Sequence, residues 1–237
     1  MPLSPLGLID KSRAFAYLPF EVRLELAKAC REVRFAKDQR IFSATEPPRE
    51  ILIVAEGRAK LIGVTEDGVP RILYVYGVGE VIGSRVLLKE SPESPFDVIA
   101  MEPVHAVAIS KKDFMRIQKV YPEVLVALSR ILIGRVERLT STMLAAMSDN
   151  ALIRLGKILV DFVDHRGGGR DGFIPLDADL THETLGQLIG TTRPHTTKLI
   201  QDLERLGGVQ RQKTKGLLVN RARLESLMRE NAKEDVA

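Results

Sequence analysis

The chain has 237 residues, of which 45% are hydrophobic and 28% charged, so we expect an ordinary globular protein of two domains. Its net charge of +4 is weak support for an anionic partner, and its single cysteine excludes an internal disulfide, an all-cysteine metal site and an iron–sulfur cluster. No run approaches the roughly 18 apolar residues of a membrane span, and the first ten residues lack the pattern of a secretory signal, so a cytoplasmic protein without a membrane partner is expected.

Short β-prone runs separated by glycine-rich turns occupy residues 20–110. A short helix over residues 20–31 precedes the runs, which lie at 51–54, 59–62, 72–75, 98–100 and 104–109. Turn signals between them include Glu66-Asp67-Gly68 and the glycines of the segment 77–83, which we interpret as turns. Many short strands with glycine-rich corners predict a compact antiparallel barrel or roll.

A long helix is predicted from Pro122, a typical first-turn proline, to about Met147. Two series of residues recur along it every seven positions, offset by four: Leu125, Leu132, Leu139 and Ala146, and Ser129, Val136 and Met143. Such a heptad seam is typical of a two-stranded coiled coil, and charged flanks favour it over a helix packed only on its own barrel. We therefore predict a homodimer with an interface formed by Leu125, Leu132, Val136, Leu139 and Met143. Asp149-Asn150 would end the helix and cap another over 151–165.

Two short helices in close succession are predicted near the C-terminus. The first covers 182–189 and is capped by Thr181, and the second covers 193–206 and is capped by Thr192. The glycine-containing turn 190–192 between them has the length found in a helix-turn-helix. A strand over 173–176 precedes the pair, and strands over 209–212 and 217–219 follow it as a hairpin that would form a wing. Leucines and isoleucines at 185, 188, 189, 199, 203 and 206 would form the small core.

The first turn of the second helix carries side chains suited to DNA: Arg193, His195, Thr196, Thr197 and Lys198. In a helix-turn-helix this end enters the major groove, where arginine binds guanine O6 and N7. Residues 205–223 contain six basic residues, including Lys213 and Lys215 of the wing, and no acidic one, which suits a phosphate backbone. A helical hairpin that packs against another protein would explain the spacing but not the cationic wing.

The segment 185–200, LGQLIGTTRPHTTKLI, resembles the recognition element of the cyclic-AMP receptor protein and fumarate-nitrate regulator (Crp/Fnr) family. The resemblance extends over roughly residues 20–225 and includes GEVIG at 79–83, Phe114, Tyr121-Pro122 and Arg154. It implies an α+β fold with a cyclic-nucleotide-binding-like β-roll over residues 1–118, a dimerisation helix over 119–148 and a winged helix-turn-helix over 149–237.

The same resemblance implies a homodimeric transcription regulator that binds near-palindromic double-stranded DNA, with RNA polymerase as a further partner. It places Arg193 and Lys198 at base- and backbone-reading positions, and Thr181, His182 and Thr192 near phosphates. Pro194 stands where the relatives that read a C·G pair carry glutamate, so we expect a different preference at that base pair.

The residues of the effector pocket depart from those of the cyclic-AMP-binding relatives. In those relatives a glutamate follows the second glycine of the Gly-Glu-x-x-Gly segment, an Arg-Ser pair follows about ten residues later, and a threonine-serine pair lies on the long helix. The corresponding positions here, with the neighbouring arginine, are Gly83, Ser84, Arg85, Ser94, Pro95, Leu139 and Thr140. A buried phosphate without a positive partner is poorly held, and strand alternation would turn Arg85 away from Ser84. We therefore predict no cyclic AMP in the usual mode, no other cofactor, and an unknown effector.

Two alternatives remain open: a cyclic-nucleotide-responsive regulator with a variant pocket, and a β-roll module that binds another protein rather than DNA. An enzyme is disfavoured, because the sequence contains no nucleotide-phosphate loop, HExxH, GxSxG or metal-spaced cysteines. Haem would need axial ligands, for which Cys30, His105 and His165 are the candidates, but a histidine in a strand such as His105 is typically structural.

Overall fold

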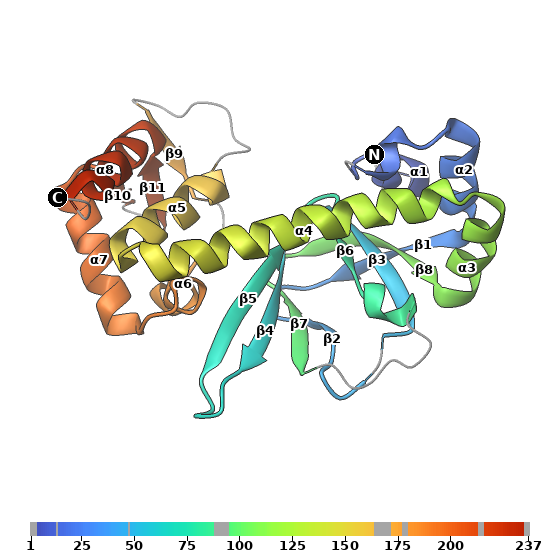
Figure 1. The fold of residues 1–237 in the computed structure, drawn as a ribbon, viewed down its shortest axis with the longest axis horizontal. Helices are drawn as coiled ribbons and strands as arrows, with labels where there is room; N and C mark the ends of the chain where they lie inside the picture. The colour runs from blue at the N-terminus through green and yellow to red at the C-terminus, as the bar shows by residue number, and fades with distance from the viewer. Residues whose placement is uncertain are drawn as a thin grey trace. The chain divides into compact units, whose positions relative to one another are not determined.

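The computed structural model describes residues 4–12, 14–46, 48–87, 95–163, 172–176, 180–212 and 216–234, the last four as backbone only (Figure 1). The chain divides into two compact units, unit 1 (Met1–Leu139) and unit 2 (Thr140–Ala237). The division falls inside the long helix α4 (Glu123–Ser148), whose observed bounds agree with the helix predicted from Pro122 to Met147. Among the described residues, no helix is long and apolar enough to span a membrane.

Unit 1 contains two antiparallel sheets of four strands each, in the orders β1-β8-β3-β6 and β2-β7-β4-β5. The strands are β1 (Cys30–Phe35), β2 (Arg40–Phe42), β3 (Glu50–Glu56), β4 (Ala59–Val64), β5 (Pro70–Tyr76), β6 (Val81–Ile82), β7 (Phe96–Ala100) and β8 (Val104–Ser110). Each of the five predicted runs lies on a strand, and the antiparallel roll is confirmed. The prediction missed three strands: β1, whose charged sequence CREVRF has no fully buried side chain, the short β2, and β6, which lies within the segment we interpreted as turns.

Strand β3 shows why the roll has two layers of core. Ile51 and Ile53 belong to a cluster that packs against helices, whereas Leu52 and Val54 on the opposite face belong to a cluster between the sheets. Successive side chains of a strand point to opposite faces, so a continuous apolar run fits a strand that is buried on both. The helix-side cluster is covered by α1 (Pro5–Ile9), α2 (Phe20–Ala29), α3 (Lys111–Val120) and the first part of α4, and a short 3₁₀ helix (Phe15–Tyr17) joins α1 to α2.

Figure 1 shows α1, α2, α3 and the start of α4 gathered at one end of unit 1. Helix α3, which the sequence analysis did not predict, begins at Ser110, whose hydroxyl accepts a hydrogen bond of 3.0 Å from the backbone N–H of Asp113. On α4, Val124, Ala127 and Leu128 are buried against the same core. One side of the first turns of α4 is thereby committed to the unit's own interior.

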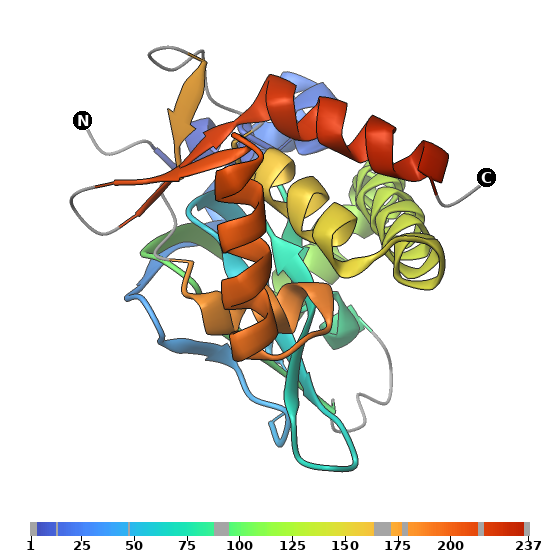
Figure 2. The same cartoon turned by 90° about the vertical axis from the view of Figure 1, so that its left-hand side faces the viewer.

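Unit 2 contains α5 (Ala151–Val163), β9 (Phe173–Pro175), α6 (His182–Ile189), α7 (Arg193–Arg205), β10 (Val209–Arg211), β11 (Leu217–Asn220) and α8 (Arg221–Glu234). The strands form a sheet in the order β10-β11-β9. Figure 2 shows α6 and α7 in orange, with the red β10–β11 hairpin beside them. This is the winged helix-turn-helix that the sequence predicted, followed by a helix, α8, that it did not. Of the predicted core, Leu185, Ile189, Leu199 and Leu203 are buried, whereas Leu188 is half-buried and Leu206, just after the end of α7 at Arg205, remains 39% exposed.

Candidate nucleic-acid interface

The two helices of the motif begin at the predicted caps. The Thr181 hydroxyl accepts a hydrogen bond of 3.1 Å from the Thr184 N–H, and the Thr192 hydroxyl accepts one of 3.5 Å from the His195 N–H. Pro194 lies in the first turn of α7, where its missing N–H has no partner to lose. Gly190 ends α6 with φ +74°, a left-handed conformation that favours glycine. Local sequence therefore sets both the length of the turn and the start of the second helix.

Helices α6 and α7 lie close together at Gly186. A Cβ atom at this position would lie 2.9 Å from Thr196 Oγ1 and 3.0 Å from the Thr191 carbonyl oxygen, so only glycine fits. Thr196 is itself fully buried, and its hydroxyl donates to the Thr192 carbonyl at 2.9 Å. The prediction that Thr196 contacts DNA is therefore wrong. The signal that could have identified this contact is the pairing of a helical glycine with a small side chain on the facing helix.

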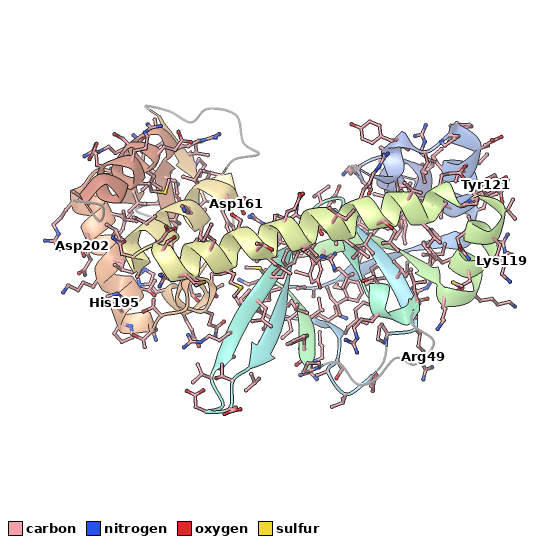
Figure 3. The ribbon with its side chains drawn as sticks, viewed as in Figure 1. Arg49, Lys119, Tyr121, Asp161, His195 and Asp202 are labelled. Carbon is pink, nitrogen blue, oxygen red and sulfur yellow. The ribbon has the colours of Figure 1, made fainter. Side chains whose placement is uncertain are left out.

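The exposed side of the first turns of α7 carries Arg193, His195 and Lys198. Figure 3 labels His195 near the N-terminal end of this helix and Asp202 further along it. Thr197 is half-buried, and its hydroxyl donates to the Arg193 carbonyl at 3.0 Å. The structure thus brings two full positive charges and one imidazole to the end of α7 that a helix-turn-helix presents to a groove.

His182 is connected to α7 through Thr197. Its Nδ1 lies 2.9 Å from Thr197 Oγ1, and because that hydroxyl already donates to a carbonyl, we assign Nδ1 as the donor. Burial lowers the pKa of His182 below its usual value, and the charges of Arg211 and Arg193 lower it further. The imidazole is therefore biased toward its neutral form and restrains the second turn of the helix.

The basic stretch 205–223 is less free than its composition indicates. Its arginines form ion pairs with carboxylates of unit 2 that lie outside the stretch. The pairs are Arg205 with Asp202, Arg211 with Glu204 (3.3 Å), Arg221 with Glu225 (2.8 Å) and Arg223 with Glu230 (3.4 Å). Counting charges along the sequence does not reveal these pairs. Asp202 and Glu225 lie one helical turn from their arginines, and Glu204 lies on a neighbouring element. Lys213 and Lys215 lie outside the described residues.

Arg154 of α5 links the motif to the residues that follow α4. Its Nε donates to the Ile189 carbonyl at 3.0 Å, which satisfies an oxygen at the C-terminal end of α6, and its Nη1 donates to the Asp149 carbonyl at 2.5 Å. The Asn150 side chain accepts a hydrogen bond of 3.0 Å from the Ile153 N–H, as expected of the cap predicted there.

The predicted effector residues are only partly described. Gly83 has φ +81°, and a Cβ there would lie 2.6 Å from the Glu50 carbonyl oxygen, so this turn requires glycine. Ser84 and Arg85 lie in a short 3₁₀ helix (Ser84–Leu87), so the expectation of an extended chain at this point is wrong: the left-handed residue before them ends β6. Pro95 is exposed, Leu139 and Thr140 are exposed on α4, and Ser94 lies outside the described residues.

The predicted dimer interface needs one correction. Leu125, Val136, Leu139 and Met143 are exposed, but Leu132 is half-buried and packs against the core of unit 1. The exposed side of α4 is instead centred on residues that alternate at spacings of three and four: Val126, Ser129, Ile133, Val136, Thr140, Met143 and Met147. This is again a heptad seam: the series Ser129, Val136 and Met143 is unchanged, and the other series is shifted by one residue. We call this set the α4 seam.

The surroundings of Cys30 and His105, two of the candidate haem ligands, suit a structural role. His105 Nε2 lies 3.3 Å from a Glu32 carboxylate oxygen, and its Nδ1 lies 3.9 Å from Glu56. Burial raises the pKa of the Cys30 thiol to about 12, so this thiol stays protonated. His165 lies outside the described residues, and within the described ranges no three His, Cys, Asp or Glu side chains are grouped as a metal site.

Comparisons with known proteins agree with both units. The profile of the cyclic nucleotide-binding domain matches residues 32–121, and that of the Crp-like helix-turn-helix domain matches residues 152–227. The chain is 23% identical over 185 residues to the CRP-like cAMP-activated global transcriptional regulator of Mycobacterium tuberculosis, covering 78% of this chain and 82% of that protein. It is 26% identical over 175 residues to the global nitrogen regulator of a Nostoc species, with coverage of 71% and 76%.

Solved structures show the same fold. The c-di-GMP responsive global regulator CLP of Xanthomonas campestris superposes with a TM-score of 0.73 at 16% identity, covering 85% of this chain and 99% of that one. FixK2 of Bradyrhizobium japonicum superposes with a TM-score of 0.69 at 18% identity, covering 84% of this chain and 96% of that one.

Proposed function

The chain belongs to the Crp/Fnr family of DNA-binding transcription regulators, and from this premise we propose that it binds a near-palindromic duplex as a homodimer, without cyclic AMP in the usual mode. The observation that carries the proposal is the exposed N-terminal end of α7, where Arg193, His195 and Lys198 lie on a helix that Thr192 caps. Arg193 is the proposed reader of guanine, because arginine binds its O6 and N7 bidentately.

Contacts to phosphate would come from residues around this helix. Thr181, His182 and Thr192 lie at the starts of α6 and α7, where helix N-termini favour anions. Thr197 is restrained by His182 and Arg193, so we assign it an orienting role at the edge of the interface. Lys213 and Lys215 of the wing complete the proposed set on the strength of the sequence alone.

The α4 seam supports the homodimer. Three of the four residues of its first series, Val126, Ile133 and Thr140, are β-branched, the fourth being Met147, and β-branched residues at this heptad position favour two parallel strands. Ile133, Val136 and Met143 are each about 60% exposed or more, which is unusual for a run of large apolar side chains along one helix. Pairing with the same helix of a second copy would remove this surface from water.

The dimer proposal is tested by Ile133→Glu, which would place a charge at the centre of the seam. We expect a monomer in sedimentation analysis and a loss of DNA affinity on the order of 100-fold, because the two half-sites are no longer bound as one unit. Ser141→Glu is the matched control: it adds the same charge to an exposed position of α4 outside the seam. A dimeric Ile133→Glu protein would contradict the proposed interface.

Independence of cyclic AMP rests on the absence of a glutamate after Gly83 and of an Arg-Ser pair near residue 95. The Mycobacterium tuberculosis relative is described as cAMP-activated, and the variant-pocket alternative would bring that property to this chain. Selection from randomised duplexes by the purified protein, with and without cyclic AMP, separates the two. A palindrome selected equally well in both supports the proposal, and selection only with the nucleotide contradicts it.

The salt dependence of binding addresses the second alternative, a module that binds protein instead of DNA. Contacts to phosphates predict that DNA affinity falls steeply between about 50 mM and 200 mM salt. RNA polymerase is the proposed partner of the DNA-bound dimer, and transcription in vitro from a selected site would show whether bound dimer raises or lowers initiation.

A further inference from the structure

Five side chains of unit 1 join α4 to the roll through a polar and aromatic cluster, which we call the α4 clamp: Tyr74, Tyr76, Glu80, Arg135 and Arg138. The Arg135 guanidinium lies 4.9 Å from the centre of the Tyr76 ring and 5.3 Å from that of Tyr74. Its Nη2 donates to the Val81 carbonyl at 2.5 Å and lies 3.3 Å from Glu80 Oε2. Arg135 thus extends from α4 into the roll between two aromatic rings.

Arg138, one turn further along α4, contacts the same partners. Its Nε donates to the Tyr74 hydroxyl at 2.9 Å, and its Nη2 forms an ion pair with Glu80. The Tyr74 hydroxyl in turn donates to Glu80 Oε1 at 3.0 Å. A single carboxylate therefore receives two arginines and a phenol, which makes Glu80 the centre of the cluster.

The burial of the cluster shows that its members depend on one another. The side chains of Glu80 and Arg135 are each 14% exposed, and both tyrosines are buried. Arg135 Nε has no hydrogen-bond partner, so the aromatic faces provide much of the environment of its charge. Burial raises the pKa of both phenols, so they stay neutral beside the ions. Removing the carboxylate would leave the nearly buried charge of Arg135 without its ion pair and beside a second cation, Arg138, whose side chain is 55% exposed.

The clamp connects the two segments that an effector would have to connect. Glu80 lies in the turn three residues before Gly83, the first residue of the predicted effector pocket. Arg138 directly precedes Leu139-Thr140, the part of that pocket on α4. The hydrogen bonds and ion pairs of the clamp already link the chain beside one segment to the chain beside the other.

We propose that the α4 clamp replaces an effector: it holds α4 on the roll from within, and by doing so keeps the protein in its DNA-competent arrangement without a ligand. An effector acts only by binding one arrangement better than another, and an internal cluster that forms in one arrangement has the same effect. The inference rests on the proposed function, since it presumes DNA binding. The clamp acts on α4 because this helix carries the α4 seam and continues to Ser148, immediately before α5.

The test uses two variants of the full-length protein. Glu80→Gln removes the charge that both arginines share, and Tyr74→Phe keeps the ring but removes the hydroxyl that joins Arg138 to Glu80. Glu102→Gln is the matched control, because Glu102, in the turn between β7 and β8, accepts a hydrogen bond of 3.0 Å from Nε of Arg58, in the turn between β3 and β4, and this ion pair also lies within unit 1. Three quantities are measured: affinity for the selected duplex, oligomeric state, and hydrogen exchange of the amides of α4.

We expect Glu80→Gln to remain dimeric, to exchange the amides of residues 135–148 faster, and to bind DNA about tenfold more weakly, within the range usual for coupling between sites. Tyr74→Phe should show the same changes at smaller size, which keeps the test informative if Glu80→Gln folds poorly. The control should change neither the DNA affinity nor the exchange rates by more than about twofold. Faster exchange with unchanged DNA affinity would show that the clamp only supports the fold, and would overturn the inference. Unchanged exchange would also overturn it.

The two proposals fail in different ways. If the unmodified protein selects no palindrome, the proposed function is wrong. The inference is overturned in the opposite case, when the unmodified protein binds its palindrome and Glu80→Gln binds it equally well.

Discussion

The helix-turn-helix and the α4 clamp place similar residue types in opposite settings. In the helix-turn-helix, Arg193 and Lys198 lie five residues apart and are exposed to solvent. In the clamp, Arg135 meets Glu80 across 55 positions of sequence, and both side chains are nearly buried. An arginine is thus a candidate for recognition in one unit and for internal support in the other. The difference teaches that exposure, and not residue type, separates a charge that can bind a partner from one that holds the fold.

The same contrast explains which interactions have value for stability. The exposed ion pairs of unit 2, such as Arg211 with Glu204, are screened by water and contribute little. A buried pair such as Arg135 with Glu80 has a large cost when one member is removed, because the other remains as an uncompensated charge. Variants at buried and at exposed positions should therefore fail differently, and three predictions compare residues in different settings.

The largest expected effect comes from the packing of the helix-turn-helix. Gly186→Val should lower the free energy of unfolding of unit 2 by about 3 kcal/mol, because its side chain would overlap Thr196 and the Thr191 carbonyl. Gly134→Ala is the control in α4, where the nearest heavy atom lies 3.9 Å away, and it should raise stability by about 1 kcal/mol. Denaturant unfolding measures both, and equal effects would contradict the close approach of α6 and α7.

A smaller effect is expected at the surface of α7. Arg193→Ala should weaken DNA binding by about 2 kcal/mol and relax the base preference at one position of each half-site. Thr196→Val should leave base preference unchanged, because this side chain is fully buried and contacts the Thr192 carbonyl. Sequence selection by each variant checks the pair. Altered preference in Thr196→Val would return Thr196 to the interface.

The smallest effect is a dependence on pH. Burial and two arginines lower the pKa of His182 in the free protein, and nearby phosphates would raise it in the complex. DNA affinity should therefore rise as pH falls from about 7, by no more than tenfold per pH unit. The folded protein, whose pKa is the lower one, should lose stability as pH falls through the unfolded value of about 6.5. His182→Gln should weaken both trends, since His195 remains at the interface, whereas His105→Gln in the roll should leave the trend in DNA affinity.

Sequence alone determined the order of the roll, the long helix and the winged helix-turn-helix, and the bounds of the helix-turn-helix to within one residue. Thr181, Thr192 and Gly190 specify caps and a turn through bonds to neighbours within four residues, so consecutive letters contain the information. Only the tertiary structure decided which side of each helix faces inward. Thr196 and Leu132 were both assigned to exposed faces, and both turn inward, because a helix rotates about 100° per residue and the position of its neighbour selects the buried side. For the same reason the clamp is invisible in sequence: its two halves become adjacent only when α4 packs against the roll.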